Sequence, residues 1–297
     1  MAQQLRGILT ALPTPFAQDG SLDEASLRAL VDHSIHGGVH GVVVNGSTGE
    51  FSALTTDERR RAVEIVVDQA GARVPVVAQT GAASTAEAVE LSKHAESAGA
   101  DVVMALTPYY ESLSEQEIKA YFRTVAASVD LPVMLYNIPG LTGIDLLPDT
   151  VGALAREVEN IQYVKNSSSD MSQSAQLIHH HGDVISTFVG WDTLLLASLI
   201  EGAAGFTAGT ANIVPAELVA VWDAVQGGKI AEARQAWNRV FPVIDAITQE
   251  PFNAAIKGVL DAVGFPVGVP RAPLAPLDPS SATRIEGLVS RLRLAAA

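Results

Sequence analysis

The strongest constraint on this chain is the regular return of short, strand-like apolar runs. Eight such runs recur along the 297 residues at intervals of about 20 to 35 residues. They cover residues 7–11, 41–45, 74–79, 101–106, 132–137, 161–165, 184–189 and 204–208. Runs that are rich in Val and Ile and apolar on both faces are typical of parallel strands covered by helices. Eight of them in succession predict an α/β protein of the closed (β/α)8 type, the TIM barrel.

The segments between the early runs carry signals for helix starts. A Ser or Thr followed three residues later by Glu, the pattern of a capping box, occurs at Ser21, Thr55, Ser84 and Ser114. After residue 210 the alternation stops, and helical patterns cover residues 215–226, 230–247, 252–263 and 279–294. The sequence therefore predicts a barrel domain over residues 1–214 and a C-terminal helical extension over residues 215–297.

The charge balance narrows the class of partner. A formal net charge of −14 argues against nucleic acid and anionic membrane surfaces, because both are bound by clustered Lys and Arg. No apolar run approaches the roughly 20 residues of a membrane span. The first six residues lack the apolar core of a signal peptide, and the chain has no cysteine for disulfides. We expect a cytoplasmic protein that acts on a small molecule.

Lys165 stands out because it ends the sixth strand-like run, where apolar residues alternate before a Ser-rich turn. The other lysines lie in helix-patterned segments, where a solvated ammonium is the ordinary expectation; they are Lys93, Lys119, Lys229 and Lys257. An ammonium beside apolar strand residues loses solvation, which favours the neutral amine that attacks a carbonyl. Lys165 is therefore a candidate Schiff-base nucleophile. Taken alone, the segment also fits a lysine whose amine reaches the surface.

Other polar groups follow the same ends of the runs, where the reactive groups of a TIM barrel lie. Gly46, Ser47 and Thr48 offer amide and hydroxyl donors, so this segment fits an anion-binding nest and a tight turn equally well. Tyr136, on the fifth run, could relay protons, although a tyrosine in a core strand more often only packs. Tyr110, after the fourth run, fits a hydrophobic plug or an interface patch.

Two groups of histidines raise the question of a metal. His33, His36 and His40 have near-helical spacing, and residues 179–181 are three consecutive histidines. Neither group has Cys, Asp or Glu at ligand spacing. The second group precedes a glycine at an expected helix end, where His interacts favourably with the helix dipole. We expect no metal site.

Two longer motifs together carry a family resemblance. They are GVVVNGSTGE at residues 41–50 and YNIP at residues 136–139, with Lys165 placed 29 residues after Tyr136. The combination resembles the pyruvate-dependent Schiff-base aldolase family that contains N-acetylneuraminate lyase and dihydrodipicolinate synthase. The likeness runs from Gly7 through the Pro-rich residues 271–274. It implies a (β/α)8 barrel with a helical C-terminal part, a homotetramer, and a lyase that needs neither a metal nor an organic cofactor.

The resemblance also implies roles for single residues. Lys165 would form an imine with the 2-oxo group of pyruvate, and Tyr136 would shuttle protons. Ser47 and Thr48, with nearby backbone amides, would hold the pyruvate carboxylate. Tyr110 resembles the tyrosine that some members lend to the site of a neighbouring subunit.

The chain departs from both named members in the residues that select a substrate. In dihydrodipicolinate synthases an arginine stands five residues after the catalytic tyrosine and binds the carboxylate of aspartate semialdehyde; here that residue is Leu141. This resembles N-acetylneuraminate lyase. Yet that lyase has Gly-Tyr-Asp-Glu after strand seven and a serine near the end of strand eight, where this chain has Gly-Trp-Asp-Thr at 190–193 and Gly209. The expected further contacts to substrate are Ser167, Gly190, Asp192 and Thr210.

The favoured hypothesis is a class I aldolase or lyase that acts on a 2-oxo-3-deoxy acid through a lysine-bound pyruvate imine, with pyruvate and an aldehyde as partners. Activity like that of N-acetylneuraminate lyase and activity as a 2-keto-3-deoxy sugar acid aldolase or dehydratase both fit. The alternative within the family is 4-hydroxy-tetrahydrodipicolinate synthase, an enzyme of lysine biosynthesis. The alternative from another class is a non-catalytic barrel that binds a 2-oxo acid, against which the retention of Tyr136 and Lys165 argues.

Overall fold

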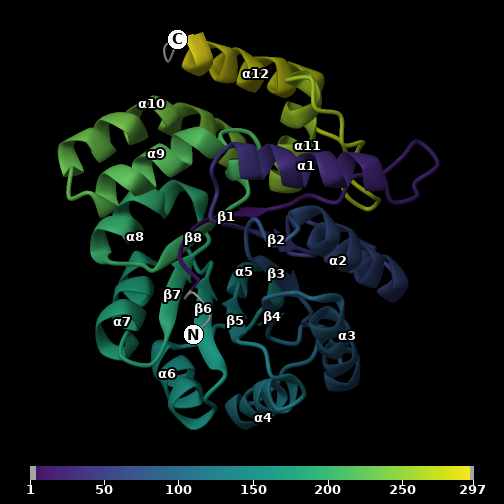
Figure 1. Ribbon diagram of the computed structural model, residues 1–297, viewed down its shortest axis with the longest axis vertical. Helices are drawn as coiled ribbons and strands as arrows, with labels where there is room; N and C mark the ends of the chain where they lie inside the picture. Colours follow the sequence, from purple (N-terminus) through teal and green to yellow (C-terminus); the bar gives the residue numbers. More distant parts are fainter. Residues whose placement is uncertain (1–4, 295–297) are drawn as a thin grey trace. The chain divides into compact units, whose positions relative to one another are not determined.

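The eight strands expected from the sequence form one closed parallel barrel. The computed structural model describes residues 5–294, and the strands follow one another round the barrel in chain order. Their bounds are β1 (Gly7–Ala11), β2 (Gly41–Val44), β3 (Val76–Gln79), β4 (Val102–Leu106), β5 (Val133–Asn137), β6 (Ile161–Asn166), β7 (Ser186–Val189) and β8 (Gly205–Ala208). The predicted (β/α)8 barrel is confirmed, and helices follow its last strand (Figure 1).

Internal contacts divide the described chain into two compact units. The first unit comprises residues 5–6 and Pro75–Thr207, and the second comprises Gly7–Val74 and residues 208–294. The division into a barrel over residues 1–214 and an extension over residues 215–297 stays a prediction.

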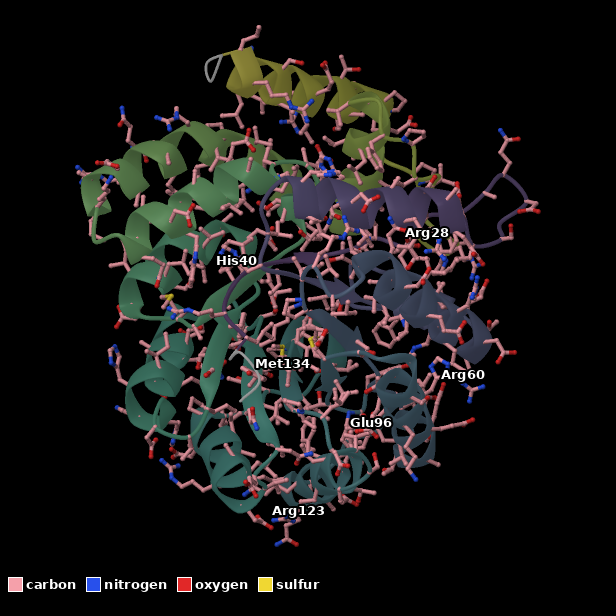
Figure 2. All side chains as sticks on the ribbon, viewed as in Figure 1. Arg28, His40, Arg60, Glu96, Arg123 and Met134 are labelled. Atoms are coloured by element: carbon pink, nitrogen blue, oxygen red, sulfur yellow. The ribbon has the colours of Figure 1, made fainter. Side chains whose placement is uncertain are left out.

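The first unit alternates strands with helices. Its helices are α3 (Thr85–Ala98), α4 (Glu115–Ala126), α5 (Pro139–Thr142), α6 (Pro148–Glu157), α7 (Met171–His181) and α8 (Leu195–Glu201), with a 3₁₀ turn, η2 (Asp192–Leu194). Figure 2 shows Met134 of β5 in the interior, where it is fully buried, and Arg123 pointing outward from α4, where it pairs with Glu157. The strands thus form the apolar core, and the helices carry the charges.

The register of β5 and β6 brings together the side chains of the predicted nucleophile and the predicted proton relay. Tyr136 is aligned with Lys165, and Asn137 with Asn166. Residues aligned on adjacent strands project from the same face of a sheet, so Tyr136 and Lys165 are neighbours. The predicted strand end was wrong by one residue, since β6 continues to Asn166. The strand is also more deeply buried than its alternation suggested, with only Gln162 exposed, because parallel barrel strands are covered on both faces.

The second unit contains the first two strands and most of the long helices. Its helices are α1 (Glu24–His36), α2 (Thr56–Ala70), α9 (Pro215–Gln226), α10 (Ile230–Thr248), α11 (Phe252–Ala262) and α12 (Pro279–Leu294), with 3₁₀ turns η1 (Phe51–Ala53) and η3 (Thr210–Asn212). Helices α9 and α10 lie side by side, and α12 packs against α10 and α11 (Figure 1). No helix within residues 5–294 combines the length and the apolar character needed to cross a membrane.

The helix starts follow the predicted capping signals with one exception. Thr55 and Ser114 form complete capping boxes, and Ser84 caps α3. The predicted start at Ser21 was wrong. Asp23 caps α1 by accepting a hydrogen bond from the amide of Ser26, while Ser21 donates instead to the Asp19 carboxylate. A carboxylate nearer to the first turn satisfies the free amides better than the serine two residues before it.

Candidate active site

Lys165 and Tyr136 lie together in the first unit and are its candidate chemical centre. Their exposed fractions are 5% and 2%, and Lys165 Nζ lies 4.1 Å from the centre of the Tyr136 ring. Within residues 5–294, no carboxylate pairs with Lys165. An amine beside a phenol is the pair that imine formation and proton transfer require.

The space for the lysine side chain depends on Gly190, the first residue after β7. A Cβ at this position would stand 2.6 Å from Lys165 Cε and closer still to Ser167 Oγ. The Ser167 hydroxyl donates to the Gly190 carbonyl at 3.0 Å, and the Ser167 amide donates to the Asn137 carbonyl at 2.8 Å. Gly190 and Ser167, both predicted as site residues, therefore lie against the lysine. They limit the space around the Lys165 side chain, and their contact with substrate stays a prediction.

A polar network that the sequence did not predict begins at the residues that follow this pair on their strands. Asn137 and Asn166 directly follow the tyrosine and the lysine on their strands. Asn137 Nδ2 donates to Asp145 Oδ1 at 2.8 Å and to Asn166 Oδ1 at 3.1 Å, and Gln173 Nε2 donates to Asp145 at 3.0 Å. The Leu146 amide donates to Asn137 Oδ1 at 2.9 Å. The network ties the loop after β5 to the strand ends. Its signal in the sequence was the asparagine that follows each of the two candidate residues.

Two other predicted residues of the first unit lie in different surroundings. Asp192, at the start of η2, is only 6% exposed. Tyr110 is 94% exposed and has a positive φ of 93°. A side chain so exposed makes almost no contact within its own chain, so the structure does not bring Tyr110 to the lysine–tyrosine pair. Leu141, in α5, is 69% exposed and presents an apolar surface in the loop after β5.

The second unit holds the predicted anion-binding loop, residues 45–50. Gly46 and Thr48 are buried and Ser47 is half-buried, although the loop joins a strand to a helix. The Ser47 carbonyl accepts from Asn253 Nδ2 of α11 at 2.9 Å, and the Gly49 carbonyl accepts from the Thr14 hydroxyl at 2.6 Å. The loop is therefore held from outside by hydrogen bonds to its backbone, which leaves it as a fixed scaffold for amide and hydroxyl donors.

The segment after β8 packs closely against that loop within the second unit. A Cβ on Gly209 would stand 2.5 Å from two ring carbons of Phe252 and 3.4 Å from Thr48 Oγ1. Phe252 thus occupies the space that a side chain at position 209 would need, which gives a physical reason for glycine there. Thr210, predicted as a substrate contact, is fully buried at the start of η3.

Lys257 corrects one expectation from the sequence. We expected a solvated helix lysine, but its side chain is 1% exposed and its Nζ lies 2.6 Å from Glu50 Oε1, whose side chain is also 1% exposed. Burial lowers the pKa of Lys257, and its hydrogen bond to Glu50 opposes that effect. A helical pattern alone does not say which lysine turns inward, because the partner carboxylate lies 207 positions earlier in the sequence.

The histidines singled out from the sequence make structural contacts. His33 Nε2 lies 3.0 Å from the Asn212 carbonyl, and His181 lies within 3.3 Å of both Arg156 and Asp149. In the part of the chain that the structure describes, no three His, Asp or Glu side chains gather as metal ligands do.

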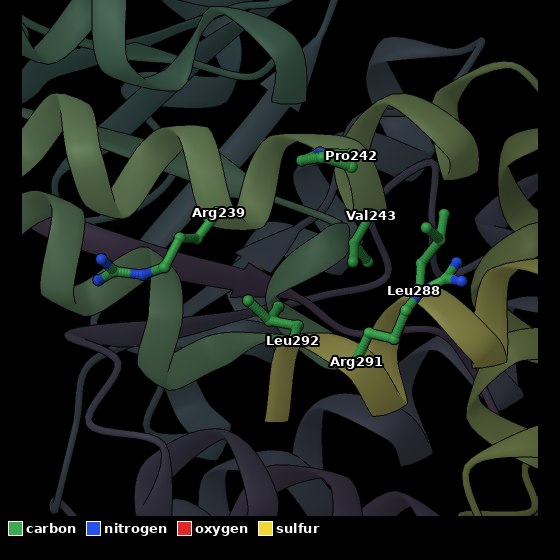
Figure 3. Close-up of a pocket in the computed structure, with 6 residues that line it drawn as sticks. All are labelled: Arg239, Pro242, Val243, Leu288, Arg291 and Leu292. Atoms are coloured by element: carbon green, nitrogen blue, oxygen red, sulfur yellow. The ribbon is translucent and has the colours of Figure 1, made fainter. Parts of the chain in front are cut away.

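A groove in the helical part of the second unit has a different character. It has a volume of about 240 Å³ and lies between α10 and α12 (Figure 3). Its lining residues are Arg239, Pro242, Val243, Leu288, Arg291 and Leu292. Apolar side chains and two guanidinium groups offer neither a nucleophile nor a proton relay. The groove is therefore not the chemical centre.

The fold and the lysine–tyrosine pair together define a class of protein. Reactive groups of TIM barrels lie at the carboxyl ends of the strands, where both residues lie. A buried amine beside a phenol at this place belongs to enzymes that work through a lysine imine. The model of the dihydrodipicolinate synthetase family matches residues 4–292, and the chain belongs to this family. It is thus a lyase of the pyruvate-dependent Schiff-base aldolases.

Relatives in this family match this chain over almost its whole length. A 4-hydroxy-tetrahydrodipicolinate synthase of Geotalea uraniireducens is 38% identical over 97% of this chain and 99% of its own length. The solved structure of YagE, a prophage protein of Escherichia coli K12 in complex with pyruvate, has a TM-score of 0.93 at 34% identity, over 98% of this chain and all of that one. CdNal from Clostridium difficile, solved with mannosamine, has a TM-score of 0.91 at 30% identity with the same coverage.

Proposed function

We propose that the protein is a class I aldolase or lyase that acts on a 2-oxo-3-deoxy acid through a pyruvate imine on Lys165. The observation that carries the proposal is the buried Lys165 amine, 4.1 Å from the Tyr136 ring and without a carboxylate partner within residues 5–294. The amine attacks C2 of the 2-oxo acid, and the carbinolamine loses water to give the imine. In the cleavage direction the C3–C4 bond then breaks as the C4 hydroxyl loses its proton, releasing an aldehyde and leaving the enamine of pyruvate.

Tyr136 is proposed to carry the protons in these steps, because a phenol at this position can take and return a proton without leaving the site. The carboxylate of the 2-oxo acid is proposed to bind the hydroxyls of Ser47 and Thr48 and the backbone amides near Gly46. Ser167, Gly190, Asp192 and Thr210 are proposed to contact the distal part of the substrate.

We also propose that the working form is a homotetramer in which Tyr110 serves the site of a neighbouring subunit. What supports this role is the near-complete exposure of its phenol in the single chain, at 94%. A tyrosine at a positive φ whose side chain makes almost no contact within residues 5–294 gains little from its own chain, which favours a use outside it.

Leu141 points to an uncharged aldehyde as the second substrate. An arginine at this position would bind a substrate carboxylate through two parallel hydrogen bonds. Leucine offers an apolar surface instead, and the sequence has no Lys or Arg between Arg123 and Arg156 to take its place. A carboxylate-bearing aldehyde would lose solvation here without a local partner. A polyhydroxy or otherwise neutral aldehyde would not.

A second candidate function is 4-hydroxy-tetrahydrodipicolinate synthase, in which pyruvate condenses with aspartate semialdehyde. It is favoured by the names of curated relatives, including those of Geotalea uraniireducens and Thermus thermophilus, both 38% identical to this chain. The two candidates share the imine and differ in the aldehyde.

The test is kcat/KM for aspartate semialdehyde and for neutral hydroxyaldehydes at one fixed pyruvate concentration. We expect the neutral aldehydes to be preferred. Leu141→Arg should then raise kcat/KM for aspartate semialdehyde by roughly 10- to 100-fold, since hydrogen bonds to charged groups are worth about 1.5–3 kcal/mol. Leu147→Arg is the matched control, because Leu147 is also exposed, at 57%, and lies in the same connection between β5 and α6. A wild-type preference for aspartate semialdehyde would favour the synthase instead.

A further inference from the structure

Lys257 and Glu50 form the most deeply buried ion pair in the described part of the chain that the chemistry above does not use. Lys257 Nζ lies 2.6 Å from Glu50 Oε1, donates to the Val269 carbonyl at 3.3 Å and lies 4.0 Å from the centre of the Phe16 ring. The other carboxylate oxygen, Glu50 Oε2, accepts from the Arg271 amide at 2.9 Å. The two carboxylate oxygens of Glu50 thus face different partners, the Lys257 ammonium at Oε1 and the Arg271 amide at Oε2.

Stability alone does not account for such a pair. Removing two charges from water costs several kcal/mol per ion, and well-packed apolar residues of the same volume are often as stabilising or more so. Glu50 adds a further cost, because its φ of 55° lies in the left-handed region that side chains other than Gly, Asn and Asp rarely adopt. An ion pair with hydrogen bonds supplies something that apolar packing does not, which is a fixed position and direction for the groups attached to it.

Glu50 is the last residue of the loop over residues 45–50. The Glu50 amide donates to the Ser47 carbonyl at 3.1 Å, and the same carbonyl accepts from Asn253 Nδ2 at 2.9 Å. Asn253 and Lys257 are four residues apart on α11, so they lie on one face of that helix. Helix α11 therefore holds the loop at two points, one at Ser47 and one at Glu50.

We propose that Asn253 and Lys257 are positioning residues that hold Gly46, Ser47 and Thr48 in the conformation that binds the carboxylate of the 2-oxo acid. Neither residue touches the reacting carbonyl. They act through the loop backbone. Their loss therefore lowers the affinity for the carboxylate of the 2-oxo acid, while the lysine imine still forms. The inference rests on the proposed function, because it assumes a 2-oxo acid as the ligand of this loop.

Three variants test this proposal, and each changes the contacts between α11 and the loop in a different way. Asn253→Ala removes one half-buried hydrogen bond and should fold as the wild type does. Lys257→Met removes the buried cation and leaves Glu50 unpaired, and the double variant Glu50→Gln with Lys257→Met removes both charges and relieves that conflict. Lys229→Met is the matched control, since Lys229 also pairs with a glutamate in the helical part of the second unit but is 62% exposed.

The measurement is borohydride trapping of the imine on the intact protein at a series of concentrations of pyruvate and of methyl pyruvate. Both compounds present a 2-oxo group, but the ester has no carboxylate. For pyruvate we expect the half-saturating concentration to rise by about 3- to 10-fold in Asn253→Ala and by more in Lys257→Met, with unchanged trapping at saturation. The double variant should recover part of the loss. For methyl pyruvate, the variants and Lys229→Met should match the wild type within about twofold.

Two results overturn the inference. One is an unchanged half-saturation for pyruvate in folded Asn253→Ala. The other is an equal rise for pyruvate and methyl pyruvate, which would mean that the contacts only support the fold. If Lys257→Met does not fold, Asn253→Ala still decides. A wild-type protein that gives no adduct with pyruvate would refute the proposed function itself, before any variant is compared.

Discussion

Two lysines of this chain are almost equally hidden from solvent and have opposite surroundings. Lys165 is 5% exposed, lies over the Tyr136 ring, and has no carboxylate partner within residues 5–294. Lys257 is 1% exposed, lies over the Phe16 ring at a similar distance, and pairs with Glu50 at 2.6 Å. The two amines thus differ in counter-ion rather than in burial or aromatic contact.

The difference lies in what each amine contacts. A carboxylate within hydrogen-bond reach makes a buried lysine part of the framework, because losing either charge would leave the other buried without a partner. Within residues 5–294 Lys165 has no such carboxylate, and its amine lies beside a phenol instead, which is the pair that imine chemistry uses. The carboxylate partner, rather than depth, therefore separates the candidate nucleophile from the structural lysine.

The largest expected effect comes from exchanging each lysine for methionine. Lys165→Met should lower kcat/KM by on the order of 10⁴-fold or more, because it removes the amine that would form the imine. It should also abolish borohydride labelling with pyruvate while leaving thermal unfolding near that of the wild type. In Lys257→Met, borohydride labelling should be retained at saturating pyruvate, and the midpoint of thermal unfolding should be lowered. Peptide mass spectrometry locates the adduct, and an adduct on Lys257 would break the comparison.

The next effect concerns the aromatic neighbour of each lysine. Tyr136→Phe should keep the ring and the fold but lower kcat by roughly 10²–10⁴-fold, because a proton relay is lost. Phe16 lies under Lys257 without a hydroxyl, so Phe16→Tyr is the complementary variant and should change kcat little. Steady-state rates of both variants at saturating substrates give the answer. Full activity in Tyr136→Phe would return Tyr136 to a packing role.

The two lysines also show which features of the fold and the site could be predicted from the sequence. The strand alternation predicted the barrel, and the strand end at Lys165 predicted a reactive amine, because both depend on residues close in the chain. The burial of Lys257 depends on Glu50, which is remote in sequence, and a helical pattern does not indicate such a partner. The same holds for Asn137, whose bonds to Asp145 and Asn166 arise only when β5 and β6 are aligned.

A smaller effect should follow from filling the space beside Lys165. A methyl group at residue 190 would collide with Lys165 Cε and Ser167 Oγ, which are the mobile ends of side chains rather than backbone. Gly190→Ala should therefore fold normally and displace the amine, with a loss of roughly 10- to 100-fold in kcat. In Gly258→Ala, beside the other lysine on α11, the added methyl group is nearest to the side chain of Leu277, so this variant should leave kcat unchanged. Equal losses in the two variants would show that local crowding at either lysine is enough.

The smallest effect on activity, and the most specific one on stability, concerns the charges around Lys257. Arg271 donates its backbone amide to Glu50 and pairs through its guanidinium with Glu58. The hydrogen bond from Arg271 is the largest cause that lowers the pKa of Glu58 to about 2, from an ordinary value of 4.5. The folded protein therefore keeps Glu58 ionised at pH values where the unfolded chain has already bound a proton.

The sign of the pH dependence follows from that difference. Because the folded pKa is the lower one, the stabilisation from Glu58 is fully present above about pH 5 and is lost as the pH falls from 4.5 towards 2. Glu58→Gln keeps an acceptor for the Thr55 cap but removes the charge, so it should lower the free energy of unfolding by about 1–3 kcal/mol at pH 7. At pH 2.5 the deficit should be much smaller. Urea unfolding of the variant and the wild type at a series of pH values measures it. Glu232→Gln, in the exposed pair with Lys229, should differ from the wild type by less than about 0.5 kcal/mol throughout. A deficit in Glu58→Gln that stays constant with pH would assign the effect to packing, and the charge cluster around Lys257 would then extend no further than Glu50.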